Sequence, residues 1–260
     1  MIVLSDEIFM TKLSEFFLLS VRLAALLIAA PVLSASAVSV PIRVALTMGI
    51  AIVLMNAVPV PRVDHMGLNG VLIIMTEALI GITIGLIFQL AFAAIAVAGE
   101  QMALSMGLGF ASMVDPQSGT QSPVVTQFLS IMLTLIFLVV GGHHVALQHL
   151  AASYKVMPIG QPFDMALTLG LVRAAALIFS AALIISIPVL IILFLLNLII
   201  GLMTRVSPQM NIFSVGFPVT IMVGFVVILI SIPSITNGMN GLIETVSNIT
   251  RDLILTGRPL

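Results

Sequence analysis

The chain has no cysteine and no tryptophan, and only 7% of its 260 residues are charged. Without cysteine it can form no disulfide, no thiolate zinc site, no iron–sulfur cluster and no cysteine nucleophile. Basic and acidic residues nearly cancel, to a net charge of −1, and no basic run is present. We therefore expect no binding to nucleic acid.

Hydrophobic residues dominate the composition, at 60% of the chain, and the mean hydropathy is +1.29. A soluble domain of this length does not need so much apolar surface. The composition therefore predicts an all-α, membrane-type protein with several spans, in contact with membrane lipid. An unusually apolar soluble helical bundle is the alternative.

The hydropathy pattern predicts about six long, partly broken helices arranged as hairpins, between a mixed lead-in (1–15) and an amphipathic tail (235–255). Pro188 is expected to split or kink the longest apolar run, because proline removes a helical hydrogen bond. Residues 33–37 resemble a signal-peptidase site, but the preceding segment is long and acidic, so we expect a retained first helix. Cleavage there is the alternative. The expected apolar segments are residues 16–40, 44–60, 70–98, 124–146, 165–203 and 219–232.

Two polar breaks interrupt the apolar pattern, at residues 99–123 and 204–218. Irregular backbone at membrane depth must be buried in protein or line an aqueous path, because lipid offers it no hydrogen bonds. The breaks resemble each other: GFASMVDPQ begins at Gly109 and GLMTRVSPQ at Gly201. Paired interruptions of this kind are typical of a pathway through a transporter core. Alternatively, each break is simply the tip of a helical hairpin.

Four charged residues lie within or beside the apolar segments: Arg22, Glu77, Glu100 and Arg173. Each would cost about 2.5–3.5 kcal/mol at the centre of a bilayer, so we expect all four to be buried against protein, water or one another. They could form structural pairs or partner contacts, or they could form a charge relay.

Three histidines, His143, His144 and His149, lie close together in the sequence. The spacing from His144 to His149 does not place both on one helical face, and a zinc site needs three or four ligands in fixed geometry. We therefore expect interfacial histidines and no metal site. The chain also lacks a G-x-S-x-G elbow and a glycine-rich phosphate loop with its lysine, so we expect neither an enzyme nor a bound cofactor.

The sequence from Gly99 to Gly160 resembles the FliR family of flagellar type III export-gate proteins. The residues that carry this resemblance are GEQMALSMGLGFASMVDPQSG, then GGHH at 141–144, then Ser153 and Pro158-Ile159-Gly160. The second break adds Arg205, Pro208, Asn211, Phe213, Gly216, Phe217 and Pro218. Virulence type III secretion homologues are similar but usually match the Val-Asp-Pro and Gly-Gly-His blocks less well. The resemblance therefore favours the flagellar branch, with the virulence branch as the alternative.

The resemblance implies a non-enzymatic subunit of the export gate in the bacterial inner membrane, within the flagellar basal body. Its partners would be FliP, FliQ, FlhB and FlhA, and it would pass unfolded flagellar subunits. Residues 1–164 would be a FliP-like part, and 165–260 a FliQ-like helical hairpin and C-terminal tail. An alternative of another class is an ion-coupled small-solute carrier with a proton relay through Glu77, Glu100 and His143.

The resemblance also implies that the loop 107–123 forms a plug inside the pore, whereas the second break would be a hairpin tip that contacts partners. The plug residues would be Met106, Gly107, Gly109, Phe110, Met113, Val114, Asp115 and Pro116.

Overall fold

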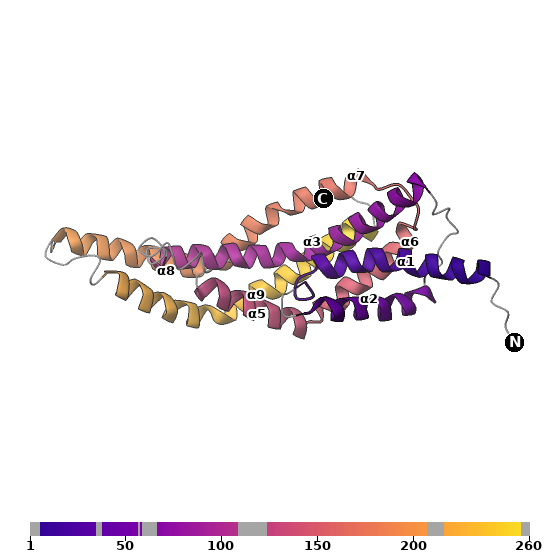
Figure 1. Ribbon diagram of the computed structural model, residues 1–260. Coiled ribbons are helices and arrows are strands. Elements are labelled where there is room, and N and C mark those ends of the chain that lie inside the picture. Colours follow the sequence, from indigo (N-terminus) through magenta and orange to yellow (C-terminus); the bar gives the residue numbers. More distant parts are fainter. Residues whose placement is uncertain are drawn as a thin grey trace. The chain divides into compact units, whose positions relative to one another are not determined.

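The structure, a computed structural model, describes residues 6–34, 38–56, 58, 67–108, 124–206 and 216–255. All regular elements in these ranges are helices, which confirms the all-α prediction. They are α1 (Asp6–Ala29), α2 (Val40–Met55), α3 (Leu68–Ser105), α5 (Val124–Val139), α6 (Gly142–Val156), α7 (Met165–Ala174), α8 (Ala176–Val206) and α9 (Phe217–Leu255) (Figure 1).

The described residues contain three stretches of helix long and apolar enough to cross a membrane: Leu68–Ser105, Met165–Val206 and Phe217–Ile254. A fourth span is present if α5 and α6 count as one broken span, and α2 is a shorter apolar helix. The membrane-type prediction is therefore confirmed, with fewer candidate spans than the number of apolar segments in the sequence.

The first helix differs from its predicted bounds at both ends. α1 already includes the polar lead-in from Asp6, and it ends at Ala29 rather than near residue 40. Pro31 explains the end, because a proline disfavours helical backbone at the residue before it. The chain then turns, and Val32 takes a positive φ of 68°.

Two other prolines do not end their helices. Pro188 lies inside α8 and Pro233 inside α9, so α9 continues from the apolar segment into the amphipathic tail. The long apolar run is instead interrupted at Ala175, between α7 and α8. Proline is tolerated inside membrane-type helices when neighbouring groups satisfy the freed backbone carbonyl.

The chain divides into two compact units. Unit 1 comprises Met1–Leu90, Gly141–Ala175 and Thr245–Leu260, and unit 2 comprises Ala91–Val140 and Ala176–Glu244. Each unit therefore combines segments that lie far apart in the sequence.

In unit 1, α1 lies along α2 (Figure 1) and packs closely against α3. A Cβ atom at Gly81 would collide with the backbone oxygen of Arg22, and one at Gly85 would lie 2.6 Å from the Cβ of Ala29. Small residues thus let the two backbones approach, as is common between helices in membranes. The fully buried core around this contact includes Leu19, Leu23, Leu26, Ile84 and Ile87.

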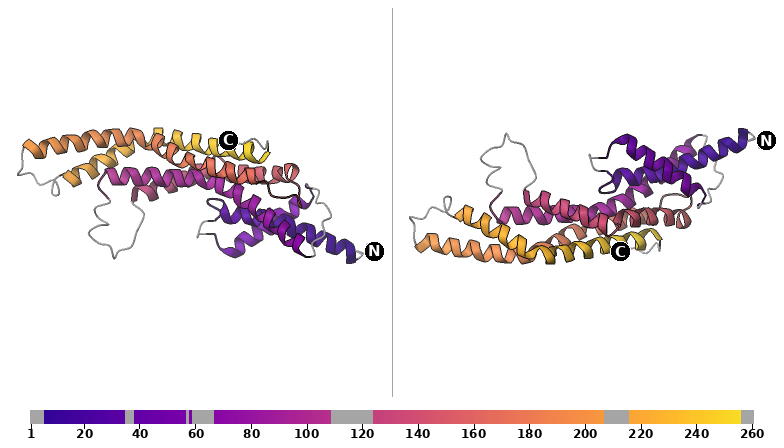
Figure 2. Two further views of the ribbon diagram at one scale, coloured as in Figure 1. Left: turned by 90° about the horizontal axis from the view of Figure 1, so that it is seen from above. Right: turned by 90° about the horizontal axis from the view of Figure 1, so that it is seen from below.

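In unit 2, α8 and the first part of α9 form a hairpin whose arms lie side by side (Figure 2). A Cβ at Gly238 of α9 would lie 2.9 Å from the Cγ1 of Ile185 on α8. α8 buries only one narrow stripe: Ala181, Ala182, Ile185, Ser186, Val189 and Leu193. Bulky side chains such as Phe179, Ile184 and Phe194 are exposed on its other faces, as suits lipid or neighbouring subunits.

Candidate functional site

The end of α3 is the described part of the chain that leads into the predicted plug. Gly107 has a positive φ of 84°. The Leu108 amide donates to the carbonyl of Ala103, and the Gly107 amide donates to the carbonyl of Leu104, both at 3.0 Å. This pair of bonds is a Schellman motif, in which a left-handed glycine closes the helix. The sequence after Ser105 therefore ends α3 through its own backbone chemistry.

The start of α9 packs directly on this helix end. A Cβ at Gly107 would lie 2.7 Å from the Cδ1 atom of Phe217, so the aromatic ring occupies the place of a side chain. Met106 is fully buried, and a Cβ at Gly224 would lie 2.6 Å from its Cγ and 2.9 Å from its Sδ. Two glycines, one on each segment, thus make room for Phe217 and Met106.

α8 contacts the same end of α3 through polar groups. The Nδ2 of Asn197 donates to the carbonyl of Ser105 at 3.2 Å, which satisfies one of the last-turn carbonyls that a helix leaves without a partner. About one turn earlier on α3, the Oε1 of Gln101 accepts a hydrogen bond from the Ser186 hydroxyl of α8 at 3.3 Å. We call the residues Met106, Gly107, Asn197, Phe217 and Gly224 the α3-end cluster.

The first turn of α9 has its own support. The buried hydroxyl of Thr220 donates to the carbonyl of Gly216 at 2.6 Å, which places Phe217 at the start of a formed helix. The ring that covers Gly107 therefore projects from an ordered turn.

The described part of the predicted plug and hairpin tip comprises Met106 and Gly107, then Arg205, Gly216, Phe217 and Pro218. Met106 and Gly216 are buried, whereas Arg205 and Pro218 are exposed. Nine predicted residues lie outside the described residues: Gly109, Phe110, Met113, Val114, Asp115, Pro116, Pro208, Asn211 and Phe213. The structure shows Phe217 packed on Gly107 of the same chain, and its predicted contact with a partner stays a prediction.

Sequence reasoning missed two members of the α3-end cluster, Asn197 and Gly224. Asn197 is the one amide side chain within the apolar run 165–203, and that isolation was a usable signal. Gly224 carries no comparable signal, because its role depends on where Met106 lies.

A second polar centre lies in unit 1, where Arg22 and Glu77 are both fully buried. The Arg22 Nε donates to the Oε2 of Glu77 at 2.7 Å, and its other nitrogens donate to the Ser153 hydroxyl at 2.9 Å and the Met157 carbonyl at 3.0 Å. The guanidinium carbon also lies 4.2 Å from the centroid of the Tyr154 ring. This centre joins α1, α3 and α6, so two of the four predicted buried charges form a structural pair.

The other two charges are not buried within the chain. Glu100 and Arg173 are both exposed in the single chain, so their coverage by partner subunits or water stays a prediction. Arg173 lies in the last turn of α7, where the helix dipole favours a positive charge near the surface. Glu100 lies on an exposed face of α3, with the exposed Leu104 one turn further on.

The three histidines separate into a pair and a single residue. The rings of His143 and His144 have centroids 4.0 Å apart, whereas His149 bonds to the Ser247 hydroxyl at 3.1 Å and packs near Phe88. Within the described ranges, no three histidine or carboxylate side chains are grouped to hold a metal ion. Glu77, a member of the alternative proton relay, is already bonded to Arg22.

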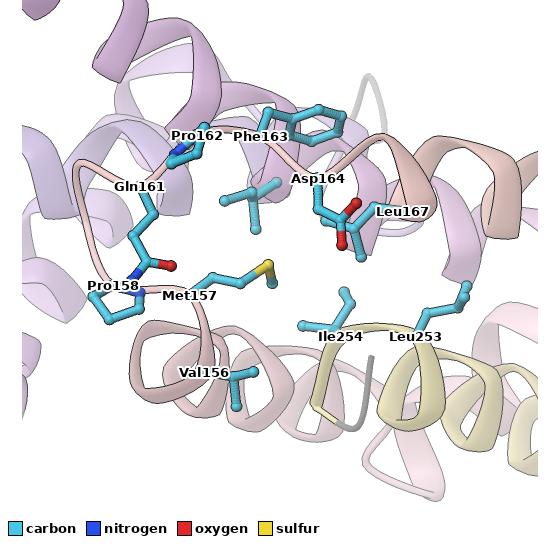
Figure 3. A pocket seen from close by; sticks show the side chains of 11 residues that line it. Val156, Met157, Pro158, Gln161, Pro162, Phe163, Asp164, Leu167, Leu253 and Ile254 are labelled. Carbon is cyan, nitrogen blue, oxygen red and sulfur yellow. The ribbon is translucent and has the colours of Figure 1, made fainter. Parts of the chain in front are cut away.

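Unit 1 also contains a cavity of about 220 Å³ between the α6–α7 connection and the last turns of α9 (Figure 3). Met157, Phe163, Leu167 and Ile254 are among its apolar lining residues. The carboxylate of Asp164 accepts a hydrogen bond from the Ala166 amide at 2.8 Å and so caps α7. Gln161 and Asp164 add polar groups to the lining, so the cavity offers both apolar and polar contact.

The described helices, with three or four candidate spans, define an all-helical membrane protein. Residues 13–246 match the family described as bacterial export proteins, family 1. The chain therefore belongs to this family, which is one of export proteins and not of enzymes.

Full-length relatives agree with this assignment. The chain is 36% identical over 242 residues to the flagellar biosynthetic protein FliR of Pectobacterium carotovorum subsp. carotovorum, covering 93% of each chain. It is 32% identical over 255 residues to FliR of Escherichia coli K12, covering 98% of each. It is 29% identical over 242 residues to FliR of Bacillus subtilis 168, covering 90% of this chain and 93% of the relative. The protein is thus a membrane component of the flagellar export apparatus.

Proposed function

We propose that this chain is a subunit of the flagellar type III export gate and forms, with FliP and FliQ, the closed pore through which unfolded flagellar subunits leave the cytoplasm. The observation that carries the proposal is the similarity to flagellar FliR proteins over almost the whole length of both chains. The gate would lie in the inner membrane within the flagellar basal body, where FlhB and FlhA contact it.

Within this gate, the loop 107–123 would be the plug. Support comes from the way its first residue is held: Gly107 caps α3 and lies under the Phe217 ring. A loop that starts from a held point can close a lumen reproducibly. Its glycines allow it to move, and methionine side chains adapt to irregular surfaces.

The α8–α9 hairpin would be the FliQ-like part, within residues 165–260, and residues 1–164 would be the FliP-like part. The exposed apolar side chains of α8 support a contact role for this hairpin, because so large an apolar surface is typical of contact with subunits or lipid.

Deleting residues 110–119 tests the plug. We expect the deletion to raise leakage of ions or small solutes in cells that assemble the gate, because the pore would have lost its stopper. Co-purification of the FliP-like and FliQ-like proteins with the tagged chain would show that the gate still assembles. A variant with 110–119 replaced by glycine and serine at the same length separates the role of the side chains from that of loop length.

Unchanged leakage from correctly assembled gates would contradict the plug. Solute uptake by the purified chain alone, without partner proteins, would instead support the ion-coupled carrier. Loss of virulence secretion with normal flagellar assembly in a strain lacking the gene would support the virulence branch.

A further inference from the structure

The α3-end cluster joins the two sequence breaks that resemble each other. α3 ends within the first break, at Ser105, and α9 begins within the second, at Phe217. The contact of Phe217 with Gly107 therefore joins a residue of one break to a residue of the other. Since these residues are distant in the sequence, the contact is a tertiary feature of unit 2.

We propose that the α3-end cluster is a latch, in which α9 holds the end of α3 while the gate is closed and releases it during export. The proposal rests on the proposed plug function of 107–123 and adds a regulator to it. The regulator is the α8–α9 hairpin of the same chain. Phe217, Gly224 and Asn197 are positioning residues, because they act through Met106, Gly107 and Ser105.

The chemistry of the contact suits a latch. α9 touches the end of α3 through a ring on Gly107 and a thioether beside Gly224, which are non-directional apolar contacts. Such contacts can separate and re-form without leaving a new polar group unsatisfied, and methionine has three rotatable bonds with which to adapt. The Schellman motif keeps the end of α3 formed by its own backbone bonds, so α3 need not unwind when α9 moves away.

The contacts also couple α8 to the same point. The Asn197 amide holds the Ser105 carbonyl, so both arms of the hairpin contact the last turns of α3. A displacement of the hairpin by partner subunits or by substrate would therefore move the residues from which the plug begins.

A disulfide across the latch provides the direct test, because the natural chain has no cysteine. We use the double variant Met106→Cys with Gly224→Cys. The Cβ of residue 224 would lie 2.6 Å from the Met106 Cγ, and a cysteine Sγ takes that Cγ position, so the two thiols are within bonding reach. In cells that assemble the gate, we expect oxidation to abolish export of flagellar subunits without raising leakage, and reduction to restore export. Bond formation is followed by thiol alkylation and mass measurement.

Ile185→Cys with Gly238→Cys is the matched control. This pair also joins α9 to a second helix of unit 2, with the Ile185 Cγ1 2.9 Å from the Cβ position of residue 238, but it leaves α3 untouched. We expect export to continue when the control disulfide is oxidised. Export that continues through an oxidised 106–224 disulfide, or that stops equally with either disulfide, would overturn the latch.

A substitution that weakens the latch should have the opposite effect to the disulfide and open the gate. We expect Phe217→Ala to raise leakage, and Phe217→Tyr, which keeps the ring on Gly107, to retain the seal. Phe225→Ala removes the same side chain from an exposed position of α9 and should not leak. If the 110–119 deletion leaks and Phe217→Ala does not, the latch is wrong and the plug stands. If the deletion does not leak, the plug itself is wrong. Where Phe217→Ala prevents assembly, the disulfide result decides.

Discussion

At the residue scale, unit 1 depends on a buried ion pair whose partners cannot be removed separately without cost. Arg22 bonds to Glu77, Ser153 and the Met157 carbonyl, and the Tyr154 hydroxyl donates to the Leu19 carbonyl at 2.9 Å. Removing one member of a buried pair leaves an uncompensated charge, whereas replacing both members with apolar groups is often neutral. Arg22 and Glu77 are therefore expected to tolerate replacement together better than replacement one at a time.

We expect Glu77→Leu to lower the free energy of unfolding by about 3–5 kcal/mol, because Arg22 would remain buried and charged. Arg22→Met should cost less, since a lone carboxyl group can be neutralised by a proton. The double variant should recover most of the loss. Denaturant or thermal unfolding of the purified full chain in detergent, arranged as a double-mutant cycle, measures this. Additive losses in the double variant would show that the two side chains are not coupled.

Gly81 is a second residue with a specific requirement. Its missing side chain is what allows the α1 backbone at Arg22 to approach α3. We expect Gly81→Ala to destabilise the protein by about 1–3 kcal/mol, as overpacking commonly does. Gly49→Ala is the control, because nothing lies within 4 Å of that position. In the middle of α2 it should stabilise by about 0.5–1 kcal/mol. The same unfolding measurement compares them, and equal effects at both positions would contradict the close approach.

At the element scale, α7 begins with a side-chain cap. Asp164 accepts a hydrogen bond from the Ala166 amide, so Asp164→Ala should destabilise the first turn of α7 by about 0.5–2 kcal/mol. Asp164→Ser, which retains an acceptor oxygen, should restore most of that loss. Amide hydrogen exchange at residues 165–168 reports the local opening. Equal exchange in all three proteins would mean that the cap adds no stability.

The prolines show the limit of predicting helix ends from the sequence. Apolar runs identified most of the helical sequence, and the two polar breaks identified where α3 and α8 end. Pro31, Pro188 and Pro233 look alike in the sequence, yet only Pro31 coincides with a helix end. Whether a helix continues past a proline depends on packing along its whole length, which lies beyond the local sequence.

The same limit applies to the candidate site. A glycine after an apolar run suggests a helix cap, so the role of Gly107 at the end of α3 was within reach of sequence reasoning. Its contact with Phe217 was not, because that contact joins distant segments and depends on the approach of α9. The burial of Arg22 and the exposure of Arg173 could not be distinguished either, since both are single arginines in apolar surroundings.

At the scale of the whole molecule, the chain exposes more apolar surface than a protein surrounded by water can tolerate. Much of it lies on α8, where Ile191 is 56% exposed. We expect Ile191→Glu to prevent recovery of the FliP-like and FliQ-like partners with the tagged chain, because a charge would have to be buried in the assembly. Asn240→Glu, at an exposed polar position of α9, should leave recovery unchanged. Normal recovery with Ile191→Glu would place this face outside the subunit contacts.

The narrow buried stripe of α8 has a consequence for the life of the protein in the cell. A copy that has not joined its partners displays Phe179, Ile184 and Phe194 on an uncovered helix. We expect lipid to cover these side chains while the copy stays in the bilayer, and partner subunits to replace that lipid on assembly. A copy extracted from the membrane without its partners would aggregate through this face.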